Sequence, residues 1–376
     1  MLQVEVISHA YIEEELRKGV AALADRLDVR VISPASADCL VFSGLNVGDS
    51  ESHIELFDPL RTVRLFGAQY VFLSPDLGFR RRPPDVICVD YDPWAIVFWQ
   101  TLLCSRLFAR RSVIVCSAKK NTYRRFPVFG WVKSLAARVG IRRTSKFIAA
   151  SHRTARMYED IFGVDKAMIE VMTHLGVDTD HFAPPADPRP IEPDRAVVGY
   201  VGRLERHKGI EDLVSAIEHL RSVTELDVRL NVCGSGSLAA ELAEMAGSRP
   251  WLSVESAVPN NQVPPFLRGL DIFVLPARVL PDHEEHDAHA LIEALACGLP
   301  CIATRSGINA ELLGDGTGVL VEPQQPLELA SAIGALVPDV ALRRELSSHG
   351  RQRAVAEFDN HRLAQRKAEL FKEVAK

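Results

Sequence analysis

The segment VGYVGRLERHKGIEDLVSAI, residues 198–217, decides the fold of this chain. Its first part is a run of apolar residues and glycine that ends at Gly202, as a buried strand would. Apolar residues then recur at the spacing of one helix face, at Ile210, Leu213, Val214, Ile217 and Leu220. A buried strand, a short turn and a core-facing helix together make one unit of a parallel α/β sheet.

The turn between this strand and helix carries two cations, Arg203 and Lys208, and Gly202 would let the backbone approach a ligand closely. A strand-to-helix turn directs backbone amides and the positive end of the helix dipole toward an anion. An arginine fork and a lysine point charge suit a diphosphate. The alternative is that both cations pair with surface carboxylates such as Glu205 or Glu211.

The same alternation runs along the whole chain. Strands are predicted at 4–7, 29–32, 63–66, 70–73, 86–89, 113–116, 147–150, 196–201, 228–233, 252–254, 272–275 and 301–304. Helices are predicted at 11–26, 94–109, 153–162, 208–220, 238–246, 262–267 and 290–296. This rhythm predicts parallel sheets with helices on both faces.

The proline-rich segment DTDHFAPPADPRPIEPDRA, residues 178–196, has no apolar periodicity, which is typical of an interdomain linker. We therefore expect a first domain at 1–180, a linker at 181–196, a second domain at 197–355 and a C-terminal segment at 356–376. Ligands of doubly wound sheets bind at the carboxyl ends of the strands, so the cleft between the domains is the expected site.

Composition excludes several classes of protein. The chain has 376 residues, 44 Lys and Arg against 49 Asp and Glu, and 47% hydrophobic residues, so it is neither disordered nor a chain-wide binder of nucleic acid. Its first residues do not resemble a secretory signal, and the longest apolar run is shorter than the ~20 residues of a membrane-spanning helix. Scattered cysteines without a C-x-x-C pattern favour a cytosolic location.

A second candidate segment is EHDAHALIEALACGLP, residues 285–300. Glu285 precedes the predicted helix and Glu293 lies inside it. The backbone amides of Ala288, His289 and Ala290 would lie between the two carboxylates, at the start of the helix. Such a pair could hold sugar hydroxyls while the amides hold a phosphate. The alternative is two glutamates whose only role is structural, near a helix end.

Two further patterns in the second domain allow other functions. His283, His286 and His289 could bind zinc in a metal-dependent hydrolase, although their spacing does not match H-E-x-x-H. Gly234 and Gly236, with Glu255 further along, come close to a dinucleotide-binding fingerprint, but not at the first strand of the domain.

The first domain contains a basic region. From Pro93 to Tyr158 there are 14 Lys and Arg and no Asp or Glu, and aromatic residues are interleaved with the basic ones near 119–143. This composition suits an anionic membrane surface or an anionic acceptor. The alternative is a solvated basic face.

Several of these segments occur together, in order, from about His174 to Pro326. They are HLGVDTDHF at 174–182, VGRLERHKG at 201–209, the E-x7-E pair Glu285 and Glu293, EALACGLPCIATRSGINAELL at 293–313 and TGVLVEP at 317–323. Together they resemble the donor-binding half of the family 4 glycosyltransferases of the GT-B fold. The resemblance implies two Rossmann-like doubly wound domains facing a central cleft. The first would bind the acceptor, and the C-terminal segment would return to it as a helix.

The resemblance also implies a retaining hexosyltransferase that uses a nucleotide-diphosphate sugar and requires no cofactor and no metal. Arg203 and Lys208 would stabilise the leaving diphosphate, and Gly202 would lie beside it. Glu293 would bind the ribose hydroxyls and Glu285 the transferred sugar. Backbone groups near Val258 would meet the base.

The sequence departs from the family pattern at three places. Residues 286–288 are His-Asp-Ala where a Gly-Phe-Gly-like run is usual, and His9 lies where a Gly-Gly loop is common. A histidine common after the strand at 113–116 is replaced, with Lys119 and Asn121 as candidate substitutes on the acceptor side. The acceptor would be a glycan, a lipid-linked sugar or a small molecule, with peripheral membrane contact through 119–143. A nucleotide-sugar epimerase or a phosphorylase of the same fold is the main alternative.

Overall fold

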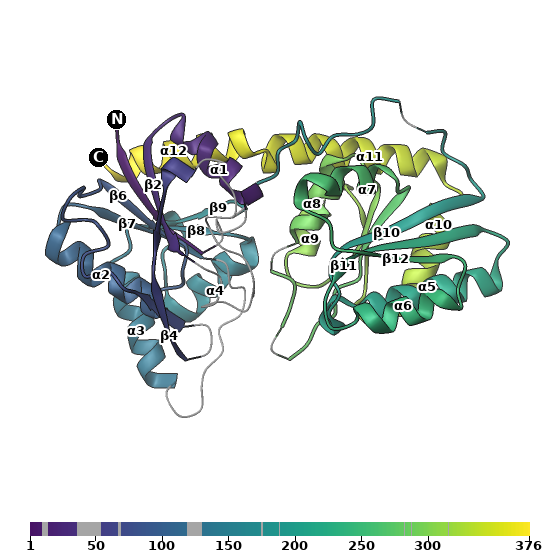
Figure 1. Ribbon diagram of the computed structural model, residues 1–376, viewed down its shortest axis with the longest axis horizontal. Helices are drawn as coiled ribbons and strands as arrows, with labels where there is room; N and C mark the ends of the chain where they lie inside the picture. Colours follow the sequence, from purple (N-terminus) through teal and green to yellow (C-terminus); the bar gives the residue numbers. More distant parts are fainter. Residues whose placement is uncertain are drawn as a thin grey trace. The chain divides into compact units, whose positions relative to one another are not determined.

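The computed structural model describes residues 1–9, 14–35, 54–66, 69–118, 130–173, 176–187, 189–281, 283–286, 288–314 and 316–376. These residues form two compact units (Figure 1). The first comprises Met1–Gly176 and Asn360–Lys376, and the second comprises Val177–Asp359. Each unit contains a parallel sheet flanked by helices, so the predicted α/β class with two Rossmann-like domains is confirmed.

The first unit is built on a seven-stranded parallel sheet in the order β3-β2-β1-β6-β7-β8-β9. Its strands are β1 (Gln3–Ile7), β2 (Asp28–Pro34), β3 (Phe57–Leu60), β6 (Val86–Val89), β7 (Val113–Ala118), β8 (Lys146–Ala149) and β9 (Ile169–Val171). All four side chains of β6 are buried, as expected for a central strand covered on both faces.

Two runs predicted as strands of a parallel sheet form a separate antiparallel pair. They are β4 (Thr62–Phe66) and β5 (Gln69–Phe72). The connection between them is too short for the crossover that parallel pairing requires, so the two runs form a hairpin.

The helices of the first unit are α1 (Glu14–Ala24), α2 (Ile96–Phe108), α3 (Gly130–Arg142), α4 (His152–Phe162) and α12 (Asn360–Val374). Helix α12 comes from the far end of the chain and packs against α1 (Figure 1). Its side chains Leu363 and Phe371 are buried in the same cluster as Val4 and Val29 of the sheet. The last helix is therefore part of the first unit's core.

The second unit has a six-stranded parallel sheet in the order β12-β11-β10-β13-β14-β15. Its strands are β10 (Arg195–Arg203), β11 (Asp227–Ser235), β12 (Leu252–Ser256), β13 (Ile272–Leu275), β14 (Cys301–Thr304) and β15 (Val319–Val321). The strand order reverses direction between β10 and β13. A ligand site of a doubly wound sheet is expected at the carboxyl ends of these two strands.

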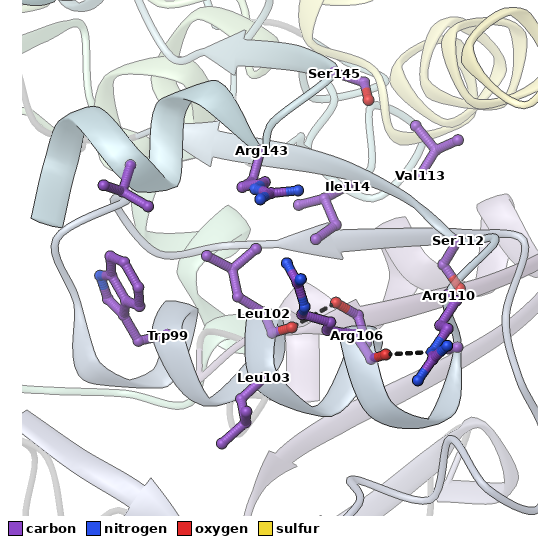
Figure 2. A pocket seen from close by; sticks show the side chains of 13 residues that line it. Trp99, Leu102, Leu103, Arg106, Arg110, Ser112, Val113, Ile114, Arg143 and Ser145 are labelled. Carbon is purple, nitrogen blue, oxygen red and sulfur yellow. Dashed lines mark hydrogen bonds between the residues drawn. The ribbon is translucent and has the colours of Figure 1, made fainter.

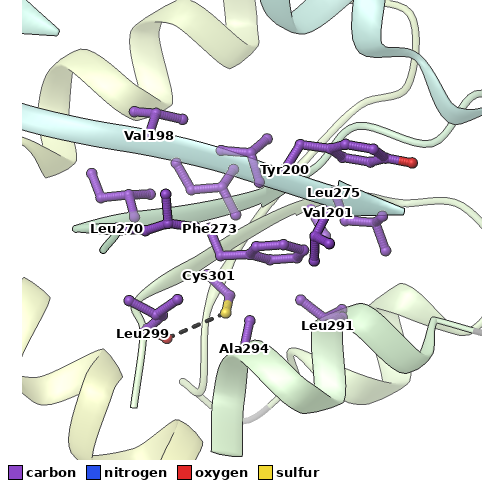
Figure 3. Packing of buried hydrophobic residues seen from close by; sticks show 14 of the residues in the cluster. Val198, Tyr200, Val201, Leu270, Phe273, Leu275, Leu291, Ala294, Leu299 and Cys301 are labelled. Carbon is purple, nitrogen blue, oxygen red and sulfur yellow. Dashed lines mark hydrogen bonds between the residues drawn. The ribbon is translucent and has the colours of Figure 1, made fainter. Parts of the chain in front are cut away.

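The helices of the second unit are α5 (Ile210–Val223), α6 (Ala239–Gly247), α7 (Val263–Arg268), α8 (His289–Ala296), α9 (Asn309–Leu312), α10 (Pro326–Leu336) and α11 (Val340–Arg353). Figure 3 shows how Phe273 of β13 and Cys301 of β14 pack with Leu291 and Ala294 of α8. This packing fixes α8, and with it Glu293, beside the central strands. Among the helices of the described residues, none is long and apolar enough to cross a bilayer.

The second unit begins before the segment that was expected to be a linker. Phe182 is fully buried in the core of this unit, and Arg351 donates hydrogen bonds to the carbonyls of Phe182 and Thr179. Strand β10 already starts at Arg195. The described part of residues 181–196 is thus anchored to the second unit, because one buried aromatic side chain outweighs the linker-like composition around it.

Candidate functional site

The loop after β10 crosses over the end of β13. Gly209 has a φ of 72°, and a Cβ at this position would lie 2.0 Å from the carbonyl oxygen of Pro276. Only glycine fits such a contact in a left-handed conformation. Residues Arg206–Lys208 form a short 3-10 turn, and α5 begins at Ile210. Lys208 therefore precedes the helix, whereas the sequence pattern placed it at the helix start.

Lys208 reaches a buried carboxylate on a distant loop. Its Nζ lies 2.6 Å from Oε2 of Glu285, and the side chains are 10% and 2% exposed. The Glu285 amide donates to Oγ of Ser306 at 3.1 Å, and its carbonyl accepts from the Ile308 amide at 2.9 Å. A Cβ on Gly307 would lie 1.6 Å from that carbonyl oxygen. The loop after β14 thus holds Glu285 in place.

The two carboxylates that the sequence offered as partners for the cations have other contacts. Glu205 accepts hydrogen bonds from the backbone and the hydroxyl of Ser237, which lower the pKa of Glu205. Glu211 pairs with Arg206 and Arg278. The lysine is therefore held by the buried glutamate of the E-x7-E pair instead of by a surface carboxylate.

Arg203 is exposed at the carboxyl end of β10, and a buried side chain of the same strand holds its backbone carbonyl. The Tyr200 hydroxyl donates to the Arg203 carbonyl at 2.8 Å, and burial raises the pKa of Tyr200, with the negative charge of Glu285 adding to the effect. Tyr200 consequently stays a protonated donor. Gly202 has a φ of 146°, and a Cβ on Gly234 would lie 1.9 Å from the Gly202 carbonyl oxygen. The neighbouring strands β10 and β11 therefore lie very close together at their carboxyl ends.

The second glutamate of the pair lies inside α8, one turn after its start. Glu293 is 4% exposed, and its Oε1 accepts a hydrogen bond from Nδ2 of Asn260 at 2.8 Å. Nδ1 of His289 lies 3.3 Å from the same oxygen. Ala288 takes the cap position before the helix without a side-chain hydrogen bond, so the helix start is formed by backbone, including the amides of His289 and Ala290.

Three histidines lie together next to the lysine–glutamate pair. The His207 and His283 rings are 4.3 Å apart between centroids, and those of His283 and His286 are 5.6 Å apart. Burial and the nearby positive charges lower the pKa of His207 to about 4, and burial also lowers the pKa of His283. Both rings are therefore predominantly neutral at pH 7.

The histidine segment does not assemble as a zinc site would. His289 contacts Glu293 within α8. Among the residues that the structure describes, no group of three or more His, Cys, Asp or Glu could hold a metal ion, and Asp287 lies outside that set. The hydrolase alternative therefore gains no support from the geometry.

The dinucleotide alternative fails because its glycine turn is already filled. A Cβ on Gly236 would lie 2.4 Å from the Leu204 carbonyl oxygen, which accepts from the Leu238 amide at 2.9 Å. The chain's own loop after β10 occupies the space that a pyrophosphate would need. Glu255 is exposed at the end of β12. Val258, the residue expected near a base, is half-buried and packs against the core of the unit.

The first unit gathers polar groups at the carboxyl ends of β1 and β6. His9 follows β1, and its ring lies 5.2 Å from that of Tyr91. Asp92 is buried and accepts from the Tyr158 hydroxyl at 3.1 Å, and burial raises the pKa of Tyr158. Lys119 and Asn121, the other two acceptor-side candidates, lie outside the described residues.

Three residues of the second unit's site were not predicted. Asn260 holds Glu293, Ser306 holds the Glu285 backbone and Tyr200 holds the Arg203 carbonyl. The sequence carried one signal for Tyr200. It is an aromatic residue with a hydroxyl group in a run, VGYVG, that is otherwise small and aliphatic. Asn260 begins a single 3-10 turn and Ser306 lies in a loop, where single polar residues carry no recognisable pattern.

Comparisons with known proteins show what this chain is similar to. Residues 186–353 match the model of the family described as glycosyl transferases group 1. A D-inositol 3-phosphate glycosyltransferase of Xylanimonas cellulosilytica is 28% identical over 226 residues, which cover 56% of this chain and 53% of that protein. A GDP-mannose-dependent alpha-(1-6)-phosphatidylinositol monomannoside mannosyltransferase of Mycolicibacterium smegmatis is 29% identical over 260 residues, or 64% of this chain and 67% of that protein. The matches thus span between about half and two thirds of these relatives' lengths.

A solved structure extends the likeness to both units. Anabaena HepE in complex with UDP aligns with a TM-score of 0.74 at 17% identity, over 99% of this chain and 100% of that one. This likeness shows the fold, with two Rossmann-like units in both proteins. The match of residues 186–353 to the group 1 model agrees with the family 4 resemblance of the sequence.

Proposed function

We propose that the protein transfers a hexosyl group from a nucleoside-diphosphate sugar to an acceptor, with retention of configuration at the anomeric carbon. The observation that carries the proposal is the buried contact between Lys208 and Glu285 at the carboxyl edge of the second sheet, within the matched family segment. It brings a cation for the diphosphate next to a carboxylate for a sugar hydroxyl.

Each donor-side residue has a distinct role in this proposal. Arg203 and Lys208 stabilise the diphosphate as negative charge develops on it. The amides at the start of α8 add backbone donors directed at the same anion. Glu293, oriented by Asn260, accepts hydrogen bonds from the ribose hydroxyls, and Glu285 binds the transferred sugar. Backbone groups near Val258 meet the base.

In the proposed reaction the bond between the anomeric carbon and the diphosphate oxygen breaks. The acceptor oxygen bonds to the same face of that carbon, and the acceptor proton passes to an oxygen of the leaving diphosphate. Because Arg203 and Lys208 supply positive charge at the leaving group, the reaction is proposed to proceed without a metal or other cofactor.

The acceptor side is assigned to the first unit, through His9 and, outside the described residues, Lys119 and Asn121. Two relatives are named for phosphate-bearing acceptors, an inositol phosphate and a phosphatidylinositol mannoside. With the basic region of residues 93–158, this supports an anionic acceptor and peripheral membrane contact through 119–143. No nucleic acid is expected as a partner.

A thermal-shift panel of UDP, GDP and ADP, each alone and as its glucose or mannose derivative, tests the donor assignment. A ligand at 100 times its dissociation constant adds ~2.7 kcal/mol to the stability of the folded state. One nucleoside diphosphate is expected to raise the melting temperature of wild type. The same compound should leave the melting temperature of Glu293→Ala unchanged. No shift with any nucleotide would reject the proposal. A nucleotide sugar that is altered without any acceptor would support an epimerase.

A further inference from the structure

A cavity of about 740 Å³ opens in the first unit, and its lining does not include His9, Tyr91 or Asp92. It lies between α2, α3 and the beginnings of β7 and β8. Figure 2 shows Trp99 and Leu103 of α2, together with Arg106, Arg110 and Arg143, among the residues that line it. The cavity therefore combines an apolar wall with three guanidinium groups.

This cavity lies at the opposite end of the sheet from His9. Val113 is the first residue of β7, and Ser145 immediately precedes β8, so both lining residues mark the amino ends of their strands. The reaction site of a doubly wound sheet lies at the carboxyl ends. The cavity is thus a second site of the first unit and not an extension of the acceptor site.

The charge of the cavity is unbalanced. Among the described residues that line it none is acidic, and the sequence has no Asp or Glu between Pro93 and Tyr158. The Arg110 Nε donates to the Arg106 carbonyl at 3.0 Å, which keeps its guanidinium at the end of α2. Arginines that line one cavity without a carboxylate repel one another, and an oxyanion bound there removes that repulsion.

Large exposed apolar side chains lie on α2 and α3. Leu103 and Leu107 on α2 are 60% and 54% exposed, and Leu135 and Val139 on α3 are 56% and 36% exposed. Leu103 and Val139, one from each helix, line the cavity and form its apolar rim, and the other two lie one helical turn away from them. A small phosphate compound would explain the arginines but not the rim, whereas an anionic lipid explains both.

We propose that the cavity binds the phosphate headgroup of an anionic phospholipid in a bilayer. Arg106, Arg110 and Arg143 contact the phosphate oxygens, and the apolar rim enters the boundary between headgroups and acyl chains. The site builds on the membrane contact of the proposed function and assigns it to α2 and α3. It does not depend on the identity of the donor.

Cosedimentation of the full chain with vesicles tests this site. Wild type should bind vesicles of phosphatidylcholine with 30% phosphatidylglycerol and fail to bind phosphatidylcholine alone. The double variant Arg106→Ser/Arg143→Ser should bind about thirtyfold more weakly, the effect expected for two basic residues at an anionic surface. The variant Leu103→Ser/Val139→Ser should also weaken binding, and high salt should not rescue it.

The matched control removes two exposed basic residues elsewhere, in Arg344→Ser/Lys372→Ser. It has the same net charge as the arginine variant and should bind like wild type. An equal loss of vesicle binding in both double variants would overturn the proposed site, because binding would then depend on net charge alone. If wild type fails to bind anionic vesicles, the proposed site is also overturned. This holds even if glycerol 3-phosphate stabilises the protein. Thermal shift by the nucleoside diphosphate checks folding of each variant and tests the donor site separately.

Discussion

The Lys208 Nζ lies 2.6 Å from Oε2 of Glu285, although 77 residues separate the two in the chain. A diphosphate that binds Lys208 must therefore share this cation with a buried carboxylate. Removing the negative charge in Glu285→Gln should strengthen binding of the nucleoside diphosphate by about five- to tenfold. Titration calorimetry measures this change.

The same substitution should lower turnover by at least ~100-fold, because the sugar loses its carboxylate contact. A variant with tighter nucleotide binding and slower transfer would support the shared cation. Unchanged or weaker binding of the diphosphate would contradict it.

Asn260 offers a test of the ribose site that leaves both glutamates in place. Its Nδ2 donates to Oε1 of Glu293 at 2.8 Å, while the next residue, Asn261, is exposed. Asn260→Ala should weaken nucleotide binding about tenfold, the equivalent of one hydrogen bond to a charged group. Asn261→Ala is the matched control and should bind like wild type. Similar affinities for the two variants would remove Asn260 from the site.

Glycine 307 tests how strictly the Glu285 loop is held. Gly307 has a φ of 53° and would place a Cβ 1.6 Å from the Glu285 carbonyl oxygen. Gly307→Ala should therefore cost ~3 kcal/mol or more and disturb nucleotide binding. Gly316 has a φ of 76°, and among the described residues beyond its chain neighbours a Cβ there would meet no atom within 4 Å, so Gly316→Ala should cost only ~1 kcal/mol. Urea unfolding of the two variants compares these costs.

The histidine cluster predicts how stability depends on pH. The pKa of His207 is lowered from 6.5 to about 4 by burial, by His283 and by Lys208 and Arg203. Between these two pH values the unfolded chain binds a proton that the folded chain does not, so stability falls on acidification and is complete above pH 6.5. Glu285 opposes the shift only in part.

Urea midpoints measured from pH 7 to pH 4 should show a shallower decline for His207→Gln than for wild type. The exposed His219 on α5 supplies the control, since His219→Gln should retain the wild-type slope. Parallel curves for wild type and His207→Gln would show that another group causes the decline.

Strand and helix positions could be predicted well where the pattern was repetitive. The segment 198–217 contained a strand, a turn and a helix in the predicted order, and only the helix start moved, from Lys208 to Ile210. That shift arises from Gly209, whose left-handed conformation is set by contact with Pro276, a residue far away in the sequence. Local patterns carry no information about such contacts.

The charged residues of the candidate site could be predicted from the sequence, but the contacts between them could not. Glu285 and Glu293 were identified by their spacing, yet their partners Lys208 and Asn260 depend on how the strands are ordered in the sheet. The proline-rich segment was misleading for a related reason. Its composition resembled a linker, but Phe182 within it is buried in the second unit.

The return of α12 to the first unit has a consequence for synthesis on the ribosome. The second unit is complete once Asp359 has been made, whereas the first unit lacks the side chains of Leu363 and Phe371 until the α12 segment has followed. The first unit can thus complete its core only after the second unit has been made. Its apolar surface beneath α12 stays uncovered until then, and a truncation before Asn360 would leave the first unit incomplete while the second could still fold.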